Sequence, residues 1–160
     1  MKILQDIGID GKDMRMIRNL YWKQKAVVQI GERKTEWIEI KKGVRQGCIL
    51  SQDLLSLYSQ KAMEEFEDLE GVRVGGVNVN NIRYADDTVL IADSEEKLQE
   101  LVETLHVACL ARGLHINLGR GKTEVMGLTK RPQDLTLNIS LEGRQINQVE
   151  SYKYLGAMVT

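Results

Sequence analysis

Residues 81–92 read Asn-Ile-Arg-Tyr-Ala-Asp-Asp-Thr-Val-Leu-Ile-Ala. Two apolar runs, Ile82–Tyr84 and Thr88–Ala92, flank Ala85-Asp86-Asp87 and predict two strands that meet at this acidic tip. Adjacent carboxylates repel one another, and in a poorly solvated setting the cost reaches about a few kcal/mol unless a cation offsets it. Hard divalent ions such as Mg²⁺ prefer carboxylate oxygens, so the pair is a candidate metal site. An ordinary exposed turn is the alternative, because Asp favours turns.

A basic segment punctuated by glycine lies upstream and reads Gly43-Val44-Arg45-Gln46-Gly47-Cys48-Ile49-Leu50-Ser51. Gly47 would let a nucleotide or a template base approach the backbone closely. Arg45 and Gln46 would contact phosphate, sugar or base edges, and the helix that we expect from Ser51 favours negative charge at its start. A basic surface loop remains the alternative interpretation of this segment.

Together these two segments resemble reverse transcriptases, most closely those of non-long-terminal-repeat (LINE-like) retrotransposons, and residues 81–92 are most similar to the RTE-like branch. The order of the family's motifs continues downstream. Gly113–Asn117 and Lys122–Val125 resemble its fourth motif, and Tyr152–Gly156 resembles its primer-grip motif. The likeness runs from about Ile7 to Thr160.

The resemblance implies an α+β fold: a partial right-hand polymerase palm with part of the fingers, an antiparallel sheet and packing helices, truncated at both ends. Residues 1–160 would form one partial reverse transcriptase domain that extends up to the primer-grip strand. The family reaction is RNA-directed DNA synthesis, in which two Mg²⁺ ions assist transfer of a nucleotide from a deoxynucleoside triphosphate to a primer 3′-hydroxyl. The implied partners are an RNA template, a DNA primer and these triphosphates.

The resemblance also implies roles for individual residues. Asp86 and Asp87 would be two of three metal-binding catalytic carboxylates, and Lys122 would protonate the pyrophosphate leaving group. The residues that would line the incoming nucleotide and the template are Arg45, Gln46, Gly47 and Tyr84. Those that would position the primer end are Tyr154, Leu155 and Gly156.

Three departures from the family pattern bear on activity. Gln52 replaces the usual Pro after Ser51, and residues 118–121 are about two residues longer than the family pattern, which could displace Lys122. The third catalytic Asp would come from a strand before Met1, and Asp6 is the only alternative candidate for it inside the chain. We therefore expect little or no polymerase activity from the isolated chain, and self-association through uncovered palm surface. A non-catalytic retrotransposon remnant, or a co-opted nucleic-acid- or protein-interaction module, is the alternative function.

Local signals predict the remaining elements. Helices are expected at Lys12–Trp22 after an Asp10 cap, from a Ser51 cap to Gly71, and from a Ser94 cap to Gly113. Tight turns are expected at Gly31–Lys34, Asn80-Asn81 and Glu142-Gly143. The strands expected outside residues 81–92 are Ala26–Ile30, Thr35–Ile40, Val72–Val74, Val77–Val79, Thr123–Leu128, Leu135–Leu141 and Tyr154–Val159.

Charge is unevenly distributed along the 160 residues, although the net charge is only −1. Residues 1–50 carry +5, residues 51–110 carry −9 and residues 111–160 carry +3.

No apolar run reaches the roughly 20 residues of a membrane span, and the N-terminus lacks a secretion signal, so we expect an intracellular protein, nuclear or cytoplasmic. The sequence has two cysteines, Cys48 and Cys109, too few for a disulfide framework, which is typical of a protein in a reducing compartment. Their spacing from each other and from the histidines is not that of a zinc site. A nucleophilic pair of Cys48 with a histidine lacks a supporting acidic residue. Trp22 and Trp37 are expected to pack in a core or over a hairpin, with base stacking as the alternative.

Overall fold

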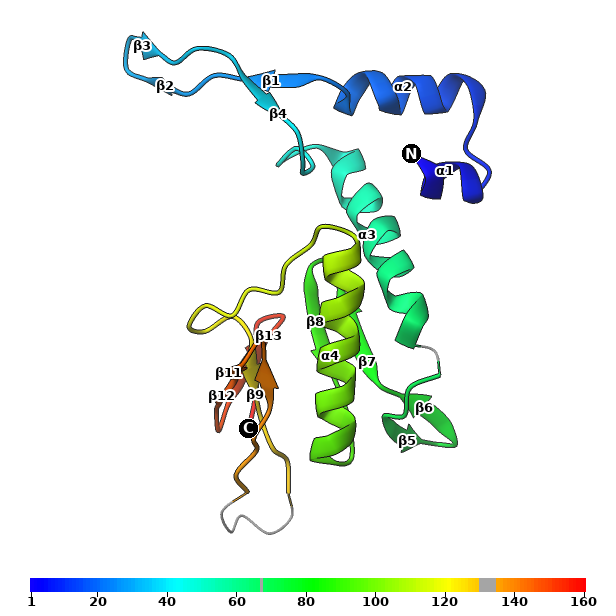
Figure 1. Ribbon diagram of the computed structural model, residues 1–160, viewed down its shortest axis with the longest axis vertical. Coiled ribbons are helices and arrows are strands. Elements are labelled where there is room, and N and C mark those ends of the chain that lie inside the picture. The colour runs from blue at the N-terminus through cyan, green and yellow to red at the C-terminus, as the bar shows by residue number, and fades with distance from the viewer. Residues whose placement is uncertain (67, 130–134) are drawn as a thin grey trace. The chain divides into compact units, whose positions relative to one another are not determined.

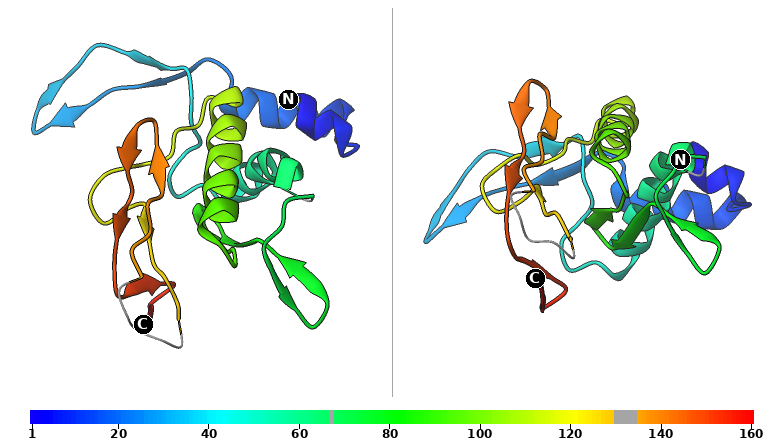
Figure 2. Two further views of the ribbon diagram at one scale, coloured as in Figure 1. Left: turned by 60° about the horizontal axis from the view of Figure 1, so that its bottom comes forward. Right: turned by 90° about the horizontal axis from the view of Figure 1, so that it is seen from below.

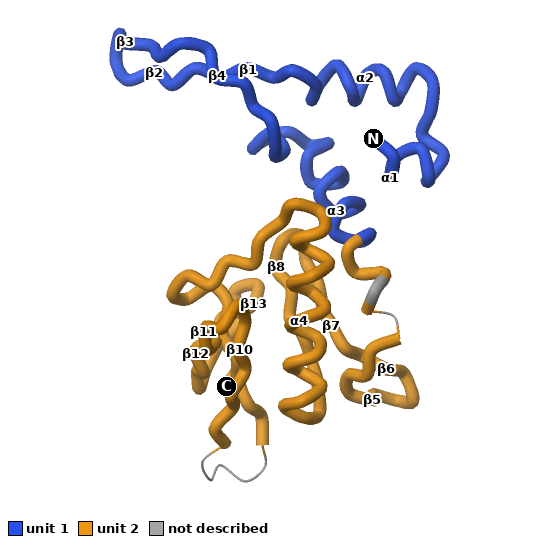
Figure 3. Tube along the Cα trace, in the orientation of Figure 1, with its two compact units in different colours: residues 1–61 blue, residues 62–160 orange. Residues whose placement is uncertain are grey.

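The computed structural model describes residues 1–66, 68–129 and 135–160. The chain divides into two compact units, Met1–Lys61 and Ala62–Thr160, which are described separately below (Figure 3). Both units mix helices with short two-stranded ladders, so the predicted α+β class is confirmed (Figure 1). None of the helices in the described residues is long and apolar enough to cross a membrane.

The first unit begins with two helices, α1 (Lys2–Asp6) and α2 (Gly11–Tyr21). Asp10 stands at the predicted N-cap position of α2, but its side chain makes no capping hydrogen bond. The apolar face of α2 is only half-covered: Met14 and Ile17 are partly buried, whereas Leu20 is exposed. Asp6 is the last residue of α1 and is exposed, which agrees with a helix-surface position for this carboxylate.

A long hairpin follows α2. Its inner ladder pairs β1 (Gln24–Ala26) with β4 (Ile38–Ile40), and its outer ladder pairs β2 (Gln29–Ile30) with β3 (Arg33–Lys34). The turn is tighter than predicted, because Arg33 and Lys34 belong to a strand and only residues 31–32 form the turn. Between the ladders the Val28 amide donates to the Thr35 hydroxyl at 3.0 Å, so a side chain takes the place of one ladder bond.

The prediction that the two tryptophans pack in a core is wrong, whereas their position over a hairpin stays a prediction. Trp22 is 63% exposed and Trp37 is 68% exposed. Every residue from 28 to 40 is exposed, because no second layer covers either face of this hairpin within the first unit. Packing in a core is therefore excluded for both side chains within this unit.

Helix α3 (Ile49–Met63) starts earlier and ends earlier than predicted, and it is followed by the 3₁₀ turn η1 (Glu64–Phe66). Ser51 is therefore not a cap: it lies in the first turn of α3, buried, with its hydroxyl 2.8 Å from the hydroxyl of Tyr21. Gly71 is not the C′ residue either, since the helix stops well before it; any side chain at Gly71 would meet the Val79 carbonyl oxygen. Glu67, inside the predicted helix span, lies outside the described residues.

The second unit opens with two hairpins. The first pairs β5 (Val72–Val74) with β6 (Val77–Val79), and the second pairs β7 (Asn81–Tyr84) with β8 (Asp87–Leu90). The predicted Asn80-Asn81 turn is wrong, because Asn81 already belongs to β7. Asn80 instead is a buried link between the two hairpins, 8% exposed.

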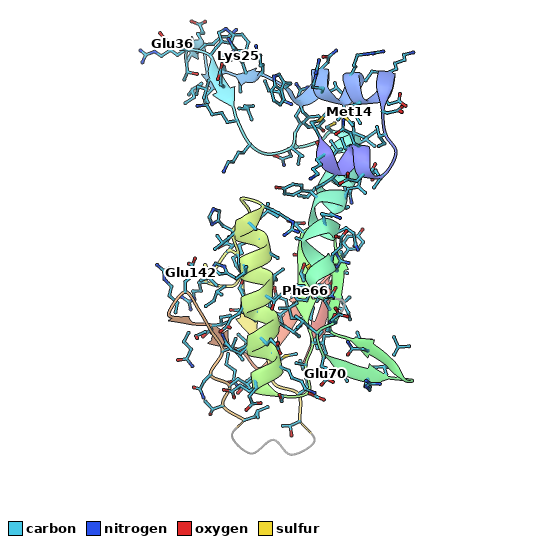
Figure 4. All side chains as sticks on the ribbon, turned by 45° about the vertical axis from the view of Figure 1, so that its right-hand side comes forward. Met14, Lys25, Glu36, Phe66, Glu70 and Glu142 are labelled. Atoms are coloured by element: carbon cyan, nitrogen blue, oxygen red, sulfur yellow. The ribbon has the colours of Figure 1, made fainter. Side chains whose placement is uncertain are left out.

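Helix α4 (Glu95–Ala111) is the central element of this unit (Figure 1). Ser94 caps it as predicted, accepting a hydrogen bond from the Lys97 amide, and Gly113 follows its end with a left-handed φ of +68°. Its inner side contributes Leu101 and Val102 to two apolar clusters. Leu101 packs with Met63 and Phe66, whereas Val102 packs with Val125, Ile139, Leu141 and Ile146 (Figure 4).

The C-terminal strands are short. They form a parallel ladder of β9 (Glu124–Val125) with β12 (Asn147–Gln148), a hairpin of β10 (Ser140–Leu141) with β11 (Arg144–Gln145), and a hairpin of β13 (Tyr152–Tyr154) with β14 (Ala157–Val159). The predicted turn at Glu142-Gly143 is confirmed. The predicted continuous strand Tyr154–Val159 is wrong, because the chain reverses at residues 155–156 (Figure 2). Every ladder in the described part of the chain has two strands, so the continuous palm sheet stays a prediction.

Candidate active site

The adjacent carboxylates Asp86 and Asp87 lie at the tip of the β7–β8 hairpin. The register pairs Tyr84 with Asp87, so Ala85 and Asp86 form a two-residue turn and Asp87 is the first residue of β8. Ala85 has a left-handed φ of 53°, at the turn position where hairpins favour glycine. A non-glycine residue in this region costs roughly 1–2 kcal/mol, and such strain clusters at functional sites. The sequence thus places both carboxylates on a strained, exposed tip.

The two faces of this hairpin differ. Leu90 of β8 packs against both apolar clusters beside α4. Since side chains alternate along a strand, Asp87 lies on the opposite face from Leu90, together with its partner Tyr84. Tyr84 is 60% exposed. The hairpin therefore presents a carboxylate and a phenol on the side that α4 does not cover.

The base of the hairpin is fixed by the buried Asn80. Its backbone carbonyl accepts from the Ile91 amide at 2.9 Å, which continues the pairing of β7 and β8. Its side-chain amide donates to the carbonyls of Phe66 at 2.7 Å and Leu69 at 2.8 Å. These bonds connect the strand that leads to the acidic tip with the chain that follows α3.

Lys122 lies in an exposed turn before β9, and its amide donates to the Gly119 carbonyl at 3.0 Å. The Tyr152 hydroxyl donates to the Lys122 carbonyl at 3.4 Å. This bond joins the Lys122 turn to the β13–β14 hairpin, at whose tip Leu155 has a left-handed φ of 48° and Gly156 one of 87°. Tyr154 ends β13, and its hydroxyl is buried without a hydrogen-bond partner.

The structure therefore brings some predicted site residues together and leaves others apart. Lys122 and the predicted primer-grip hairpin are joined by one hydrogen bond. In the described part of the chain, neither of them is hydrogen-bonded or ion-paired to Asp86 or Asp87. The described residues also hold no group of three or more His, Cys, Asp or Glu side chains that could bind a metal ion.

The predicted nucleotide- and template-binding residues Arg45, Gln46 and Gly47 belong to the first unit, where all three are exposed. Gly47 has a φ of +77°, which a side chain would strain, and no atom lies within 4 Å of where its Cβ would be. The Arg45 guanidinium Nε donates to the Gln24 side-chain oxygen at 3.1 Å. The loop is therefore open to a ligand at Gly47 and tethered to β1 at Arg45.

Comparison with known protein families agrees with this arrangement of motifs. Residues 1–159 match the family described as reverse transcriptase (RNA-dependent DNA polymerase). This chain belongs to the reverse transcriptase family. The predicted resemblance to a reverse transcriptase of a non-long-terminal-repeat retrotransposon is confirmed, and the alternative of a co-opted module is not favoured. The RTE-like branch stays a prediction.

Three curated relatives show how much of a longer protein the matched region represents. A transposon-derived protein of Caenorhabditis elegans is 32% identical over 88 residues, which are 55% of this chain and 31% of the relative. The Pol polyprotein of the type-1 retrotransposable element R2 from Nasonia vitripennis is 24% identical over 148 residues, 87% of this chain and 14% of the polyprotein. The corresponding polyprotein from Bradysia coprophila is 27% identical over 136 residues, 81% of this chain and 16% of its own length. This reverse transcriptase chain thus spans less than a third of each relative.

Sequence reasoning missed one cluster of the reverse transcriptase chain. The Tyr21 hydroxyl lies 3.4 Å from the Cys48 Sγ and 2.8 Å from the Ser51 hydroxyl. Hydrogen bonding from Tyr21, and then from Ser51, lowers the pKa of Cys48 to about 7. Burial, followed by the Cys48 hydrogen bond, raises the pKa of Tyr21. The partner of Cys48 is thus a tyrosine 27 positions away and not a histidine, and no local sequence pattern signals such a contact.

Proposed function

We propose that residues 1–160 form the part of a polymerase domain, palm with some of the fingers, that carries two of the catalytic carboxylates for RNA-directed DNA synthesis. The observation that supports this most is the placement of Asp86 and Asp87 on a strained two-residue hairpin tip within a chain that matches the reverse transcriptase family over residues 1–159. The substrates are a primer 3′-hydroxyl and deoxynucleoside triphosphates, and the template is RNA.

The donor set at the tip fits hard divalent cations. Carboxylate oxygens are the ligands that Mg²⁺ prefers, and both side chains are exposed and without an ion pair in the described structure. Asp86 and Asp87 would hold Mg²⁺, which when bound supplies charge stabilisation for the attacking primer oxygen and for the departing pyrophosphate. Two carboxylates do not complete this set. We propose that the third comes from another part of the longer protein, because Asp6 ends a short helix and does not follow an apolar strand as the family's third carboxylate does.

The other predicted residues act on binding and on proton transfer. Gly47 gives the triphosphate or the template close access to the backbone, while Arg45 and Gln46 contact phosphate, sugar or base edges. Tyr84, on the open face with Asp87, contacts the incoming nucleotide. Tyr154, Leu155 and Gly156 hold the primer end, and the Lys122 ammonium donates a proton to the pyrophosphate, a contribution of roughly 10²–10⁴-fold.

Primer extension on poly(rA)/oligo(dT) with dTTP and Mg²⁺ tests this function. Residues 1–160 alone are expected to give little or no extension, whereas the longer protein should extend the primer. In the longer protein, Asp86→Asn and Asp87→Asn should each abolish extension, while the matched control Asp53→Asn, an exposed carboxylate on α3, should leave it unchanged. Full activity of the Asp87→Asn variant would refute the assignment of the pair.

The isolated chain offers a second test, because metal binding does not require catalysis. Mn²⁺, added in place of Mg²⁺, can be followed by electron paramagnetic resonance as free ion is lost from solution. We expect weak binding that the Asp86→Asn, Asp87→Asn double variant removes and that Asp53→Asn retains. Equal Mn²⁺ binding by the double variant would place the metal elsewhere.

A further inference from the structure

The hairpin of residues 22–42 has an unusual surface for a part of a folded domain. No residue in this range is buried. Its largest exposed apolar side chains are Ile30, 78% exposed, with Trp37 at 68% and Trp22 at 63%. These two are the only tryptophans in the sequence. We call residues 22–42 the aromatic–basic hairpin.

The same segment carries an excess of positive charge. Residues 22–42 contain six Lys or Arg and three Glu, a net charge of +3. All of them are described, and none of these six cations forms an ion pair there. Unpaired cations beside exposed indoles are the combination by which proteins bind nucleic acid strands: the cations follow the phosphates and the rings stack on bases.

The order of these side chains along the hairpin supports one continuous surface. Trp22 is the C-cap of α2, next to β1. Trp37 directly precedes Ile38, which pairs with Ala26, so it stands one residue beyond the end of the β1–β4 ladder. Arg33 and Lys34 then follow at the far end, in β3. Aromatic and basic residues thus occur at the base, the middle and the tip.

The base of the aromatic–basic hairpin is tied to the loop of Arg45, Gln46 and Gly47. Gln24, two residues after Trp22, accepts the hydrogen bond from Arg45 at 3.1 Å. A strand that lies on the hairpin can therefore continue onto the loop without leaving the first unit. This continuity and the charge favour a polyanionic ligand over a protein partner, whose contact with an apolar surface would not require six unpaired cations.

We propose that the aromatic–basic hairpin is a binding surface for a single-stranded nucleic acid, with Trp22 and Trp37 stacking on unpaired bases and the lysines and arginines contacting phosphates. The ligand class rests on the proposed function, but the surface is separate from the carboxylate hairpin. Binding here needs no divalent metal. Duplex binds more weakly, because its bases are already stacked on one another.

The tryptophans themselves report on this surface. Purified residues 1–160 are titrated with a 20-nucleotide oligo(U), labelled with fluorescein for anisotropy and unlabelled for tryptophan emission, in low salt with EDTA. Stacking quenches tryptophan emission in parallel with the rise in anisotropy, and affinity falls as salt increases. Binding without any change in tryptophan emission would overturn the proposal.

Substitutions of the tryptophans distinguish stacking on bases from non-specific apolar binding. The Trp22→Leu, Trp37→Leu double variant keeps apolar side chains and should weaken binding by at least about fivefold to hundredfold, since the loss of a single stacked base already contributes that factor. Trp37→Tyr restores a stacking ring and should recover most of the loss seen with Trp37→Leu. The matched control is Val77→Leu, a side chain 64% exposed on the β5–β6 hairpin of the other unit, which should bind like the original chain.

Three further measurements keep the outcomes distinct. Circular dichroism melts must match between the variants and the original chain, because the hairpin contributes no buried residue. The Asp86→Asn, Asp87→Asn variant should bind oligo(U) normally in EDTA, so failed primer extension and failed strand binding are independent results. If the tryptophan double variant binds oligo(U) unchanged but converts a sedimenting dimer to a monomer, the hairpin joins copies of this chain and the proposal is wrong.

Discussion

Different interactions stabilise the two compact units of the chain. In the first unit the buried side chains are Leu4 and Ser51, in the described residues. The second unit contains both apolar clusters, assembled around α4. The first unit therefore depends more on side-chain hydrogen bonds, such as those of Tyr21 and Thr35, whereas the second depends on burial of apolar surface.

The hairpins of the two units differ accordingly in which of their faces are packed and which are open. The carboxylate hairpin of the second unit has one face anchored to a core through Leu90 and one face open at Asp87. The aromatic–basic hairpin of the first unit has no anchored face, so its apolar side chains remain available for a ligand. A rigid support suits the proposed role of the carboxylates in holding metal ions at fixed positions, and an uncovered surface suits the proposed binding of a flexible strand.

Removing core volume from the second unit should have the largest effect. Leu101 is fully buried on the inner side of α4, so Leu101→Ala should lower the free energy of unfolding by about 2–5 kcal/mol. Leu110, on the same helix and 42% exposed, provides the control Leu110→Ala, which should cost much less. Urea unfolding followed by circular dichroism measures both. Equal losses for the two variants would mean that α4 does not organise a core.

Disconnecting the carboxylate hairpin from that core should have the next largest effect. Asn80→Leu removes two hydrogen bonds, to the Phe66 and Leu69 carbonyls, and should cost about 1–3 kcal/mol in total, although each carbonyl keeps one other donor, the Leu69 amide and the Asn78 side chain. Asn78 also donates to the Leu69 carbonyl and accepts from the Gly71 amide, both at 2.8 Å, so Asn78→Leu is the matched change that should loosen the β5–β6 hairpin and not residues 81–91. Hydrogen exchange should show faster opening of residues 81–91 in Asn80→Leu alone. Similar exchange in the two variants would contradict the anchoring role of Asn80.

The elements that could be predicted from sequence are those specified by neighbouring residues. Ser94 caps α4 and Gly113 follows its end because both signals act within one turn. The ends of both strands that carry Asp86 and Asp87 agree with the prediction to within two residues, because apolar strands flank a turn-forming pair. The reverse transcriptase family could also be predicted, since several motifs occur in order along nearly the whole chain.

The errors occur where a distant contact overrides a local signal. Ser51 has the residue type of a cap, yet its hydroxyl pairs with Tyr21, 30 positions away, inside a helix that begins at Ile49. Asn80 has the residue type of a turn, yet it is buried against carbonyls 11 and 14 positions earlier. The core packing predicted for Trp22 and Trp37 is wrong because residue type alone does not reveal whether a second layer covers a hairpin.

A smaller effect should follow from loosening the hydrogen-bonded first unit at Tyr21. Tyr21→Phe removes the hydrogen bond between Tyr21 and the buried Ser51 hydroxyl, which should cost about 1 kcal/mol in that unit. It should also raise the pKa of Cys48 from about 7 toward the ordinary thiol value, since the Tyr21 hydrogen bond is the main cause of the lowering. Alkylation of Cys48 by iodoacetamide at pH 7 should therefore be slower in the variant.

The lowered pKa of Cys48 makes both the stability of the first unit and the reactivity of this thiol depend on pH. A thiol whose folded pKa is lowered stabilises the fold above its unfolded pKa, and this contribution is lost as the pH falls through about 7. Cys48 alkylation in the original chain should thus reach half its maximal rate near pH 7. Cys109, whose pKa is raised by burial, is the internal control and should react only at higher pH. Identical pH profiles for the two cysteines would contradict the Tyr21–Cys48 contact.

The smallest expected effect concerns the strain at the acidic tip. Ala85→Gly removes a left-handed penalty of roughly 1–2 kcal/mol but adds about 0.4–1 kcal/mol of unfolded-state entropy, so the second unit should gain between about 0 and 1.6 kcal/mol. Ala26→Gly in β1 of the first unit is the matched change at a regular strand position, and it should instead lose about 0.5–1 kcal/mol. Urea unfolding measures the two signs. A loss in Ala85→Gly would show that the tip is not strained, and Asp86 and Asp87 would then owe their position to the ladder alone.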